Sequence, residues 1–152
     1  MNPMPADELR DLYRELILDH ARSPRHFGKP PGFTHTAKGV NPLCGDRLDL
    51  YLNIDDQGNI SDAAFEGSGC AISVASASLL TDAVIGMDST RALDYAAALI
   101  GSLKGSDTGI ELGKLRALEG VREFPSRVKC ATLAWHAMGS AIRQDTQAAS
   151  TE

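Results

Sequence analysis

The chain has 152 residues, of which 43% are hydrophobic and 23% charged, and its formal net charge is −5. This length and composition fit one globular domain over residues 1–152. A negative chain without a long Lys/Arg cluster argues against a nucleic-acid partner, and no apolar run reaches the roughly 20 residues that span a bilayer. The N-terminus lacks the pattern of a signal peptide, so we expect a cytoplasmic protein without a membrane partner.

Hydrophobic periodicity predicts a helix followed by strands in the first half of the chain. Apolar residues at helical spacing predict an amphipathic helix over 7–21, which Ser23-Pro24 ends because proline disfavours helix at the residue before it. Residues 34–40 are a weakly indicated strand. Alternation over 48–54 predicts a half-buried strand, and 60–66 its hairpin partner, which Gly67-Ser68-Gly69 interrupts.

Only helices are predicted in the second half, over 70–85, 90–103 with Ser89 as N-cap, 111–118 and 125–143. Residues 144–152 are polar and predict a disordered tail. Strands followed by a run of helices imply an α+β fold. We therefore expect a small three-stranded antiparallel sheet with helices packed on one face.

Three cysteines, Cys44, Cys70 and Cys130, carry the candidate chemistry. Their number and surroundings do not resemble a disulfide-rich secreted scaffold. Each could be a small buried apolar side chain, a nucleophile paired with a histidine base, or a metal ligand. The four histidines lie away from the cysteines in sequence, so a Cys–His pair would depend on the fold; they are His20, His26, His35 and His136.

A metal site is indicated most directly by Cys44-Gly45-Asp46, where a glycine that permits a sharp turn separates a soft thiolate from a hard carboxylate. Cys70 opens a predicted helix, whose positive dipole end favours thiolate, and Cys130 lies in the first turns of the last helix. If the fold brings these segments together, Cys44, Asp46, Cys70 and Cys130 form a four-ligand site suited to zinc or to iron.

Such a site would carry four negative charges, which a dication only half neutralises. Arg47, Arg127 and Lys129 flank the ligands in sequence and could offset the remainder. The alternative is that these three are ordinary solvated surface charges.

Five segments together resemble the U-type iron–sulfur cluster assembly proteins, over about residues 9–143. These segments are Leu12-Tyr13-Arg14-Glu15-Leu16-Ile17-Leu18-Asp19-His20, Ser23-Pro24-Arg25, Asn41-Pro42-Leu43-Cys44-Gly45-Asp46, Phe65-Glu66-Gly67-Ser68-Gly69-Cys70-Ala71-Ile72-Ser73 and Phe124-Pro125-Ser126-Arg127-Val128-Lys129-Cys130-Ala131. The resemblance implies a SufE/NifU-like fold.

Two branches of this superfamily differ near the last cysteine. The scaffold branch has a histidine immediately before it, where this chain has Lys129, and its chaperone-docking motif is replaced here by Phe124-Pro125-Ser126-Arg127-Val128-Lys129. The segment between Cys70 and Cys130 is also longer than in the scaffold branch, with an extra stretch around 105–121. In these features the chain resembles the SufU branch, known as zinc-dependent sulfur acceptors for a SufS-type cysteine desulfurase.

Carried over to this chain, the resemblance implies zinc on Cys44, Asp46, Cys70 and Cys130, with Cys44 as the thiol that receives sulfur. It also implies that a desulfurase histidine replaces Cys44 on the metal, and that the sulfur passes to a downstream iron–sulfur scaffold complex. Arg127 and Lys129 would stabilise the thiolate or persulfide. The alternatives are a scaffold on which the same four ligands hold a nascent iron–sulfur cluster, and a structural zinc domain used for protein interaction.

Overall fold

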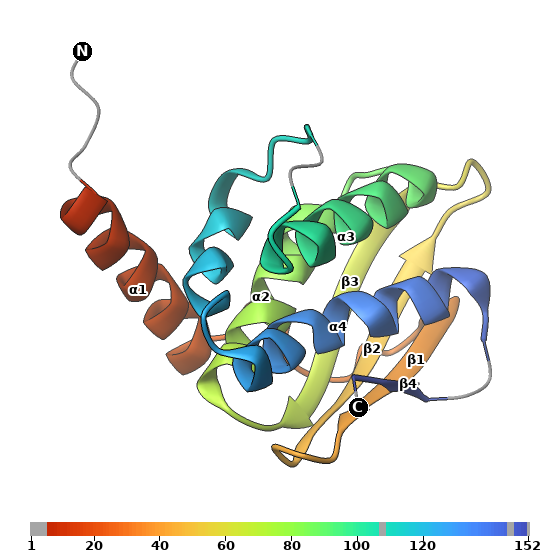
Figure 1. Cartoon of the computed structure of the whole chain (residues 1–152). Helices are drawn as coiled ribbons and strands as arrows, with labels where there is room; N and C mark the ends of the chain where they lie inside the picture. The colour runs from red at the N-terminus through yellow and green to blue at the C-terminus, as the bar shows by residue number, and fades with distance from the viewer. Residues whose placement is uncertain (1–5, 107–108, 146–147, 152) are drawn as a thin grey trace.

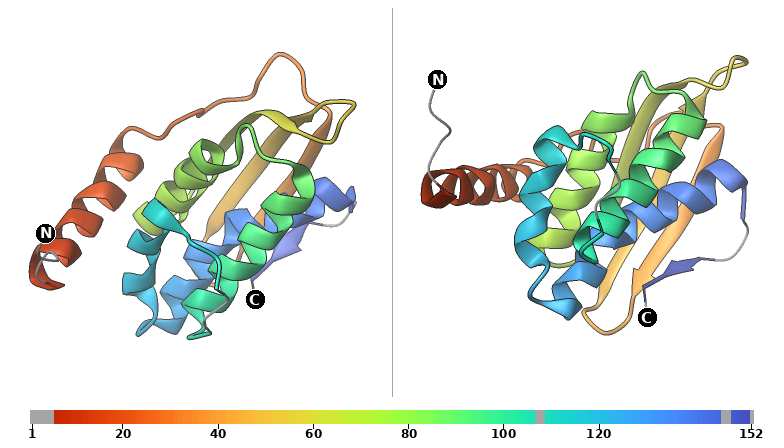
Figure 2. Two further views of the ribbon diagram at one scale, coloured as in Figure 1. Left: turned by 90° about the horizontal axis from the view of Figure 1, so that it is seen from above. Right: turned by 45° about the horizontal axis from the view of Figure 1, so that its top comes forward.

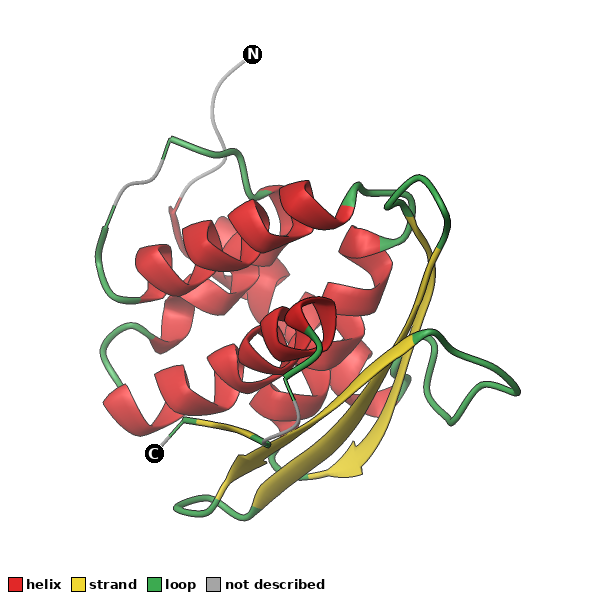
Figure 3. Ribbon diagram, turned by 90° about the vertical axis from the view of Figure 1, so that its right-hand side faces the viewer, coloured by secondary structure: helices red, strands yellow, loops and turns green. Residues whose placement is uncertain are grey.

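The computed structural model describes residues 6–106, 109–145 and 148–151, apart from the side chains of residues 6, 7 and 9. The elements follow one another as α1 (Ala6–Arg22), β1 (His35–Asn41), β2 (Asp46–Ile54), β3 (Ile60–Ser68), α2 (Ala71–Val84), α3 (Ser89–Leu103), the 3-10 helix η1 (Gly113–Val121), α4 (Pro125–Arg143) and β4 (Ala149–Ser150). The helices cover one face of the sheet, as Figures 1 and 3 show, which confirms the predicted α+β class.

The sheet has four strands in the order β3-β2-β1-β4, so the prediction of three antiparallel strands is wrong. The β1–β2 and β2–β3 pairs are antiparallel as expected, but β4 adds to β1 in parallel, through Gly39–Ala149 and Val40–Ser150. The unpaired backbone groups at the β1 edge explain this addition. After α4 the chain reverses at Gln144, whose φ is 58°, and two residues of the predicted disordered tail, 144–152, return to that edge. Residues 146–147 and 152 of this tail lie outside the described residues.

The core lies between the sheet and the helices α2 and α4. Leu48, Leu50 and Leu52 of β2 point into it and are buried. The hydroxyl of Ser76 in α2 donates to the carbonyl of Ala131 in α4 at 2.5 Å and accepts from the Trp135 indole N–H at 3.1 Å. These buried bonds fix α2 against α4, and therefore fix the beginnings of both helices relative to each other.

Two predicted boundaries differ for local reasons. β3 continues to Ser68 because a glycine at 67 can approach the neighbouring strand: a Cβ there would lie 2.2 Å from the Arg47 carbonyl oxygen. The N-cap of α3 is Asp88, not Ser89, since the Asp88 carboxylate accepts the backbone N–H groups of Thr90 and Arg91.

α1 extends from the side of the helical layer and packs against α2 and η1, as the two views of Figure 2 show. Its last turn is fixed by buried His20, whose Nδ1 lies 2.7 Å from the Ser78 hydroxyl of α2. The backbone N–H of Arg25 donates to the same hydroxyl at 2.8 Å. In the described part of the chain no helix has both the length and the apolar character that crossing a membrane requires.

Candidate metal and sulfur site

Three segments that are far apart in the sequence meet at one end of the molecule. They are the turn between β1 and β2, the loop that enters α2, and the first turns of α4 (Figures 1 and 2). The backbone N–H of Cys70 donates to Asp46 at 2.8 Å, which joins the second segment to the first. The Asn41 amide reaches Cys130 at 3.7 Å, which joins the third. The fold therefore brings all three cysteine segments to one place.

Three of the four predicted ligands form a tight group. The Sγ atoms of Cys44 and Cys130 and a carboxylate oxygen of Asp46 all lie within 4.8 Å of one another. Cys130 and Asp46 are almost completely buried, with 0% and 1% of their surface exposed, whereas Cys44 is exposed. Cys44 lies on the β1–β2 turn, beside Gly45, whose φ of +73° other residues rarely adopt. Two members of the group, Asp46 and Cys130, are therefore buried, and the third, Cys44, presents its thiol at the surface.

The Asp46 carboxylate is fixed by donors on both of its oxygens. Oδ1 accepts the Cys70 backbone N–H at 2.8 Å, and Oδ2 accepts Asn41 Nδ2 at 3.2 Å. The close approach of the α2 loop depends on Gly69, because a Cβ on that residue would lie 2.4 Å from Asp46 Oδ1 and 3.1 Å from Asp46 Cα. The glycines before Cys70 therefore have a geometric role that the sequence motif alone did not reveal.

Cys70, the fourth predicted ligand, lies beside this group but is not part of it. It is the N-cap of α2, and its Sγ accepts the backbone N–H of Ser73 at 3.4 Å. Its thiol also interacts with that of Cys130. The backbone of Cys70 is bound to the Asp46 carboxylate, so this residue lies directly next to the other three predicted ligands.

Burial and the neighbouring thiols and carboxylate determine whether Cys130 is protonated. The pKa of the Cys130 thiol is raised mainly by its burial, and further by hydrogen bonding with Asp46, Cys70 and Cys44. Without a cation among these donors Cys130 therefore remains a thiol at neutral pH. A bound dication would reverse this preference and release the proton.

The predicted basic residues have different positions. Arg127 lies on the first turn of α4, where Cys70, and after it Cys130, raise the pKa of its guanidinium through electrostatic attraction and hydrogen bonding. Lys129 is half-buried on the same helix. Arg47 is exposed, while its neighbour Asp46 is buried. Because successive strand residues point to opposite faces, Arg47 points away from the group.

Asn41 is a site residue to which sequence reasoning gave no role. It is completely buried at the end of β1 and is the register partner of Asp46. Its Nδ2 contacts both Asp46 Oδ2 and Cys130 Sγ. Its Oδ1 is buried without a hydrogen-bond partner within the described residues. The sequence feature that could have indicated this role is a polar residue directly before the Pro42–Gly45 turn.

The donor group contains no histidine, which argues against the Cys–His nucleophile hypothesis. His20 and His26 lie beside hydroxyls of α2, Ser78 and Thr81. The donor set of two clustered thiols, an adjacent third thiol and a buried carboxylate fits zinc or iron, since both bind thiolate and carboxylate ligands.

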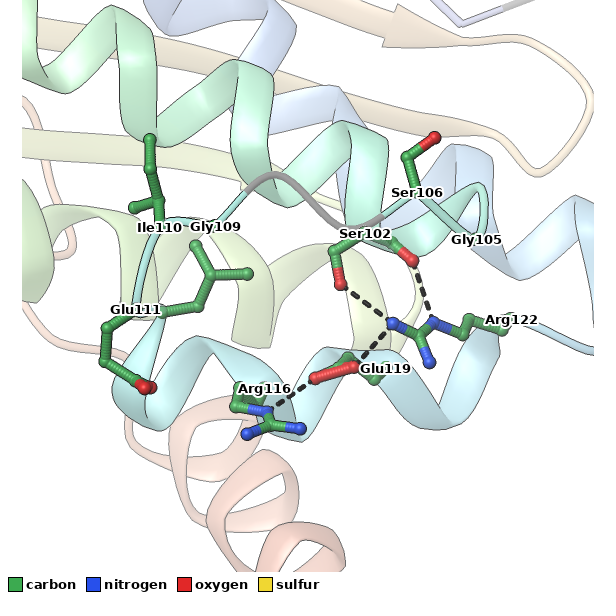
Figure 4. A pocket seen from close by; sticks show the side chains of 10 residues that line it. Ser102, Gly105, Ser106, Gly109, Ile110, Glu111, Arg116, Glu119 and Arg122 are labelled. Carbon is green, nitrogen blue, oxygen red and sulfur yellow. Dashed lines mark hydrogen bonds and ion pairs between the residues drawn. The ribbon is translucent and has the colours of Figure 1, made fainter.

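A separate pocket lies between the end of α3, the 109–112 segment and η1, as Figure 4 shows. Its two arginines are already paired: Arg116 and Arg122 both contact Glu119, and Arg122 also donates to the carbonyl and hydroxyl of Ser102. The cysteine group therefore remains the candidate site.

The fold and this donor group define a small α+β domain with a candidate metal site of two clustered thiols and a carboxylate at one end of its sheet. The chain belongs to the family of NifU-like N-terminal domains, whose model matches residues 12–148. It is 40% identical over 147 residues to the iron–sulfur cluster assembly scaffold protein IscU of Streptococcus pyogenes serotype M1, covering 95% of this chain and 91% of that protein. It is also 40% identical over 139 residues to the zinc-dependent sulfurtransferase SufU of Bacillus subtilis (strain 168), covering 90% and 93%.

Solved structures agree with this assignment. FiSufU from Fervidobacterium islandicum AW-1, described as a candidate scaffold for the SUF system, matches with a TM-score of 0.80 at 32% identity, covering 84% of this chain and 94% of that one. A nitrogen-fixing NifU-like protein (N-terminal) from Brucella abortus matches with a TM-score of 0.77 at 28% identity, over 90% and 95%.

Proposed function

We propose that this chain is a zinc-dependent sulfurtransferase, which accepts persulfide sulfur from a SufS-type cysteine desulfurase for iron–sulfur cluster assembly. The observation that carries the proposal is the exposed Cys44, placed on a turn within 4.8 Å of the buried Asp46 and Cys130. The identity to a SufU sulfurtransferase supports it. So does Lys129, because in the resemblance described above the scaffold branch has a histidine in that place and the SufU branch does not.

Cys44, Asp46, Cys70 and Cys130 are the residues that would hold the ion. Bound zinc keeps thiolates deprotonated at neutral pH and has no redox chemistry of its own. Asp46 and Cys130 are buried and fixed by hydrogen bonds, so they remain in place. Cys44 lies on an exposed turn, the kind of segment that most easily moves, and is therefore the ligand best placed to leave.

In the transfer step the Cys44 thiolate attacks the outer sulfur of the donor persulfide. A bond forms between Cys44 Sγ and that sulfur, the sulfur–sulfur bond of the donor breaks, and the donor cysteine leaves as a thiolate. No external oxidant or reductant is needed. Arg127, beside Cys70 and Cys130, offsets the negative charge at the site. Lys129, on the same turn of α4, would assist it.

Substitution Cys44→Ser tests the proposal, with turnover of a matched cysteine desulfurase as the measurement. We expect the variant to keep its fold, since Cys44 is exposed, and to leave the desulfurase at its basal rate. Mass spectrometry should find one extra sulfur on Cys44 of the wild-type protein after incubation with desulfurase and cysteine. Sulfur only on Cys130, or full stimulation by the variant, contradicts the proposal. A variant that loses stability but still stimulates turnover indicates a purely structural zinc domain.

A scaffold function is the second candidate, because a relative of equal identity is named as an iron–sulfur cluster assembly scaffold. The same donors would then hold a nascent cluster and release it to an acceptor. Anaerobic reconstitution with iron and sulfide distinguishes the two. A scaffold becomes brown and transfers its cluster, whereas a sulfurtransferase retains one zinc per chain and forms a persulfide.

A further inference from the structure

We propose that the side-chain amide of Asn41 directs sulfur to Cys44 by hydrogen bonding to Cys130 and Asp46. Asn41 would be a positioning residue that determines which of the three thiolates is the acceptor. This inference rests on the proposed sulfurtransferase function. It concerns how the protein distinguishes three chemically similar sulfurs that lie side by side.

The position of Asn41 is fixed by the sheet. Asn41 and Asp46 are the last register pair of β1 and β2, so the amide points to the carboxylate from directly across the ladder. Nδ2 lies 3.2 Å from Asp46 Oδ2 and 3.7 Å from Cys130 Sγ, so its two hydrogens face one oxygen and one sulfur. Both contacts are buried.

The opposite side of the same amide is unsatisfied. Asn41 Oδ1 is buried and accepts no hydrogen bond from the residues that the structure describes. An unpaired buried carbonyl destabilises the fold, and an apolar side chain of similar size would avoid this penalty. The two donated hydrogens are therefore the contribution of this side chain, which points to a role in the site rather than in folding.

Hydrogen bonds to sulfur divide the three thiols into two kinds. Cys130 accepts a hydrogen bond from Asn41 Nδ2, Cys70 accepts the Ser73 backbone N–H at 3.4 Å, and the Arg127 guanidinium interacts with both of these sulfurs. Within the described residues no nitrogen donor reaches Cys44 Sγ. Donors stabilise a thiolate and lower its basicity, and a less basic thiolate is a weaker nucleophile. Cys44, the thiolate without a nitrogen donor, is also the exposed one. Both its higher reactivity and its accessibility therefore favour Cys44 as the acceptor.

Asn41 also orients Asp46. With Cys70 N–H on Oδ1 and Asn41 on Oδ2, the carboxylate cannot rotate without losing a hydrogen bond. Removing the amide would free Asp46 and activate Cys130 together. Both changes reduce the preference for Cys44.

Substitution Asn41→Leu, which keeps the size and removes both donors, is the main test. In zinc-loaded protein, brief alkylation with iodoacetamide followed by peptide mass spectrometry gives the modification rate of each cysteine. We expect the Cys130-to-Cys44 rate ratio to rise about tenfold on loss of a hydrogen bond to a charged sulfur. In cobalt-loaded protein the sulfur-to-cobalt charge-transfer band should move to lower energy. Asn53→Leu is the matched control, since the side-chain amide of Asn53 donates to the Gly32 carbonyl at 3.0 Å on the exposed surface.

Asn41→Ala, which removes both donors without adding charge or bulk, covers the case in which Asn41→Leu does not fold. We expect it to shift the alkylation ratio and the cobalt band in the same directions. With desulfurase and cysteine present, sulfur should appear on Cys130 as well as Cys44 in either variant. An unchanged ratio and band in a folded variant overturn the role of Asn41, whether or not sulfur transfer occurs. Absence of a wild-type persulfide on Cys44 instead overturns the proposed function, and the alkylation result does not depend on it.

Discussion

Gly69 shows how a single missing side chain can determine the geometry of a candidate metal site. The α2 loop approaches Asp46 so closely that a Cβ at position 69 would overlap its carboxylate, at 2.4 Å from Oδ1. We expect Gly69→Ala to displace Asp46 at a cost of about 1–3 kcal/mol, as overpacked sites do. Zinc release to a chromogenic chelator should then be about tenfold faster or more, since about 1.4 kcal/mol corresponds to a factor of ten.

The control for this variant is Gly32→Ala, because a Cβ there meets no atom within 4 Å. It should release zinc at the wild-type rate. Equal release rates in both variants would mean that the loop can move away from Asp46 without disturbing it, and that Gly69 is not needed for the site.

At this scale the sequence pointed to the candidate donors but not to the residues that hold them in position. Cys44, Asp46 and Cys130 are reactive residue types, and the structure brings them together. Asn41 and Gly69 gave no comparable signal, because their importance comes from strand register and from the approach of two backbones. Both depend on contacts between distant segments, which composition and spacing do not contain.

Among the elements, the attachment of α1 to α2 makes a pH-dependent contribution to stability. Burial is the main cause that lowers the pKa of His20, and nearby Arg25 adds to it, while Asp82 and Asp19 oppose it. A histidine with a lowered pKa in the folded state binds fewer protons than in the unfolded chain. Its contribution is therefore complete above its unfolded pKa of about 6.5 and is lost as the pH falls below that value.

We expect the free energy of unfolding to fall by up to about 1.4 kcal/mol per pH unit from this residue once the pH is below about 6.5. Urea unfolding of the wild type and of His20→Asn between pH 7.5 and 5 measures this pH dependence. Subtracting one profile of unfolding free energy against pH from the other removes the contributions that both proteins share. The profiles should converge towards low pH. Parallel profiles would show that His20 is protonated equally in both states.

Element prediction succeeded where periodicity was strong and failed at the edges of the sheet. The helices α2 and α4 and the β2–β3 hairpin followed from local patterns, whereas β1 corresponds to the strand that was only weakly indicated over 34–40. β4 did not, because two residues have no period and their pairing depends on the open edge of β1. The extension of β3 to Ser68 was likewise concealed by glycines that usually indicate a break.

At the scale of the whole molecule, the donor group connects the β1–β2 turn to α2 and α4, which are adjacent in space but distant in sequence. A zinc ion that bound these donors in the folded chain alone would stabilise folding by RT ln(1 + [Zn]/Kd), which is about 4 kcal/mol at a thousand times Kd. Above Kd we expect the free energy of unfolding to rise by about 1.4 kcal/mol for each tenfold increase in free zinc.

Urea unfolding in zinc-buffered solutions measures this dependence, with the fluorescence of Trp135, the one tryptophan of the chain, as the signal. In Asp46→Ala the rise should begin at a higher free zinc concentration, because one ligand is missing and Kd increases. Asp49→Ala is the matched control, since Asp49 lies on the same strand and pairs with Lys38 at 3.0 Å at the surface. It should follow the wild-type curve. If the unfolding free energy of the wild type is independent of zinc, the ion does not connect these segments, and Asp46 has its buried position for another reason.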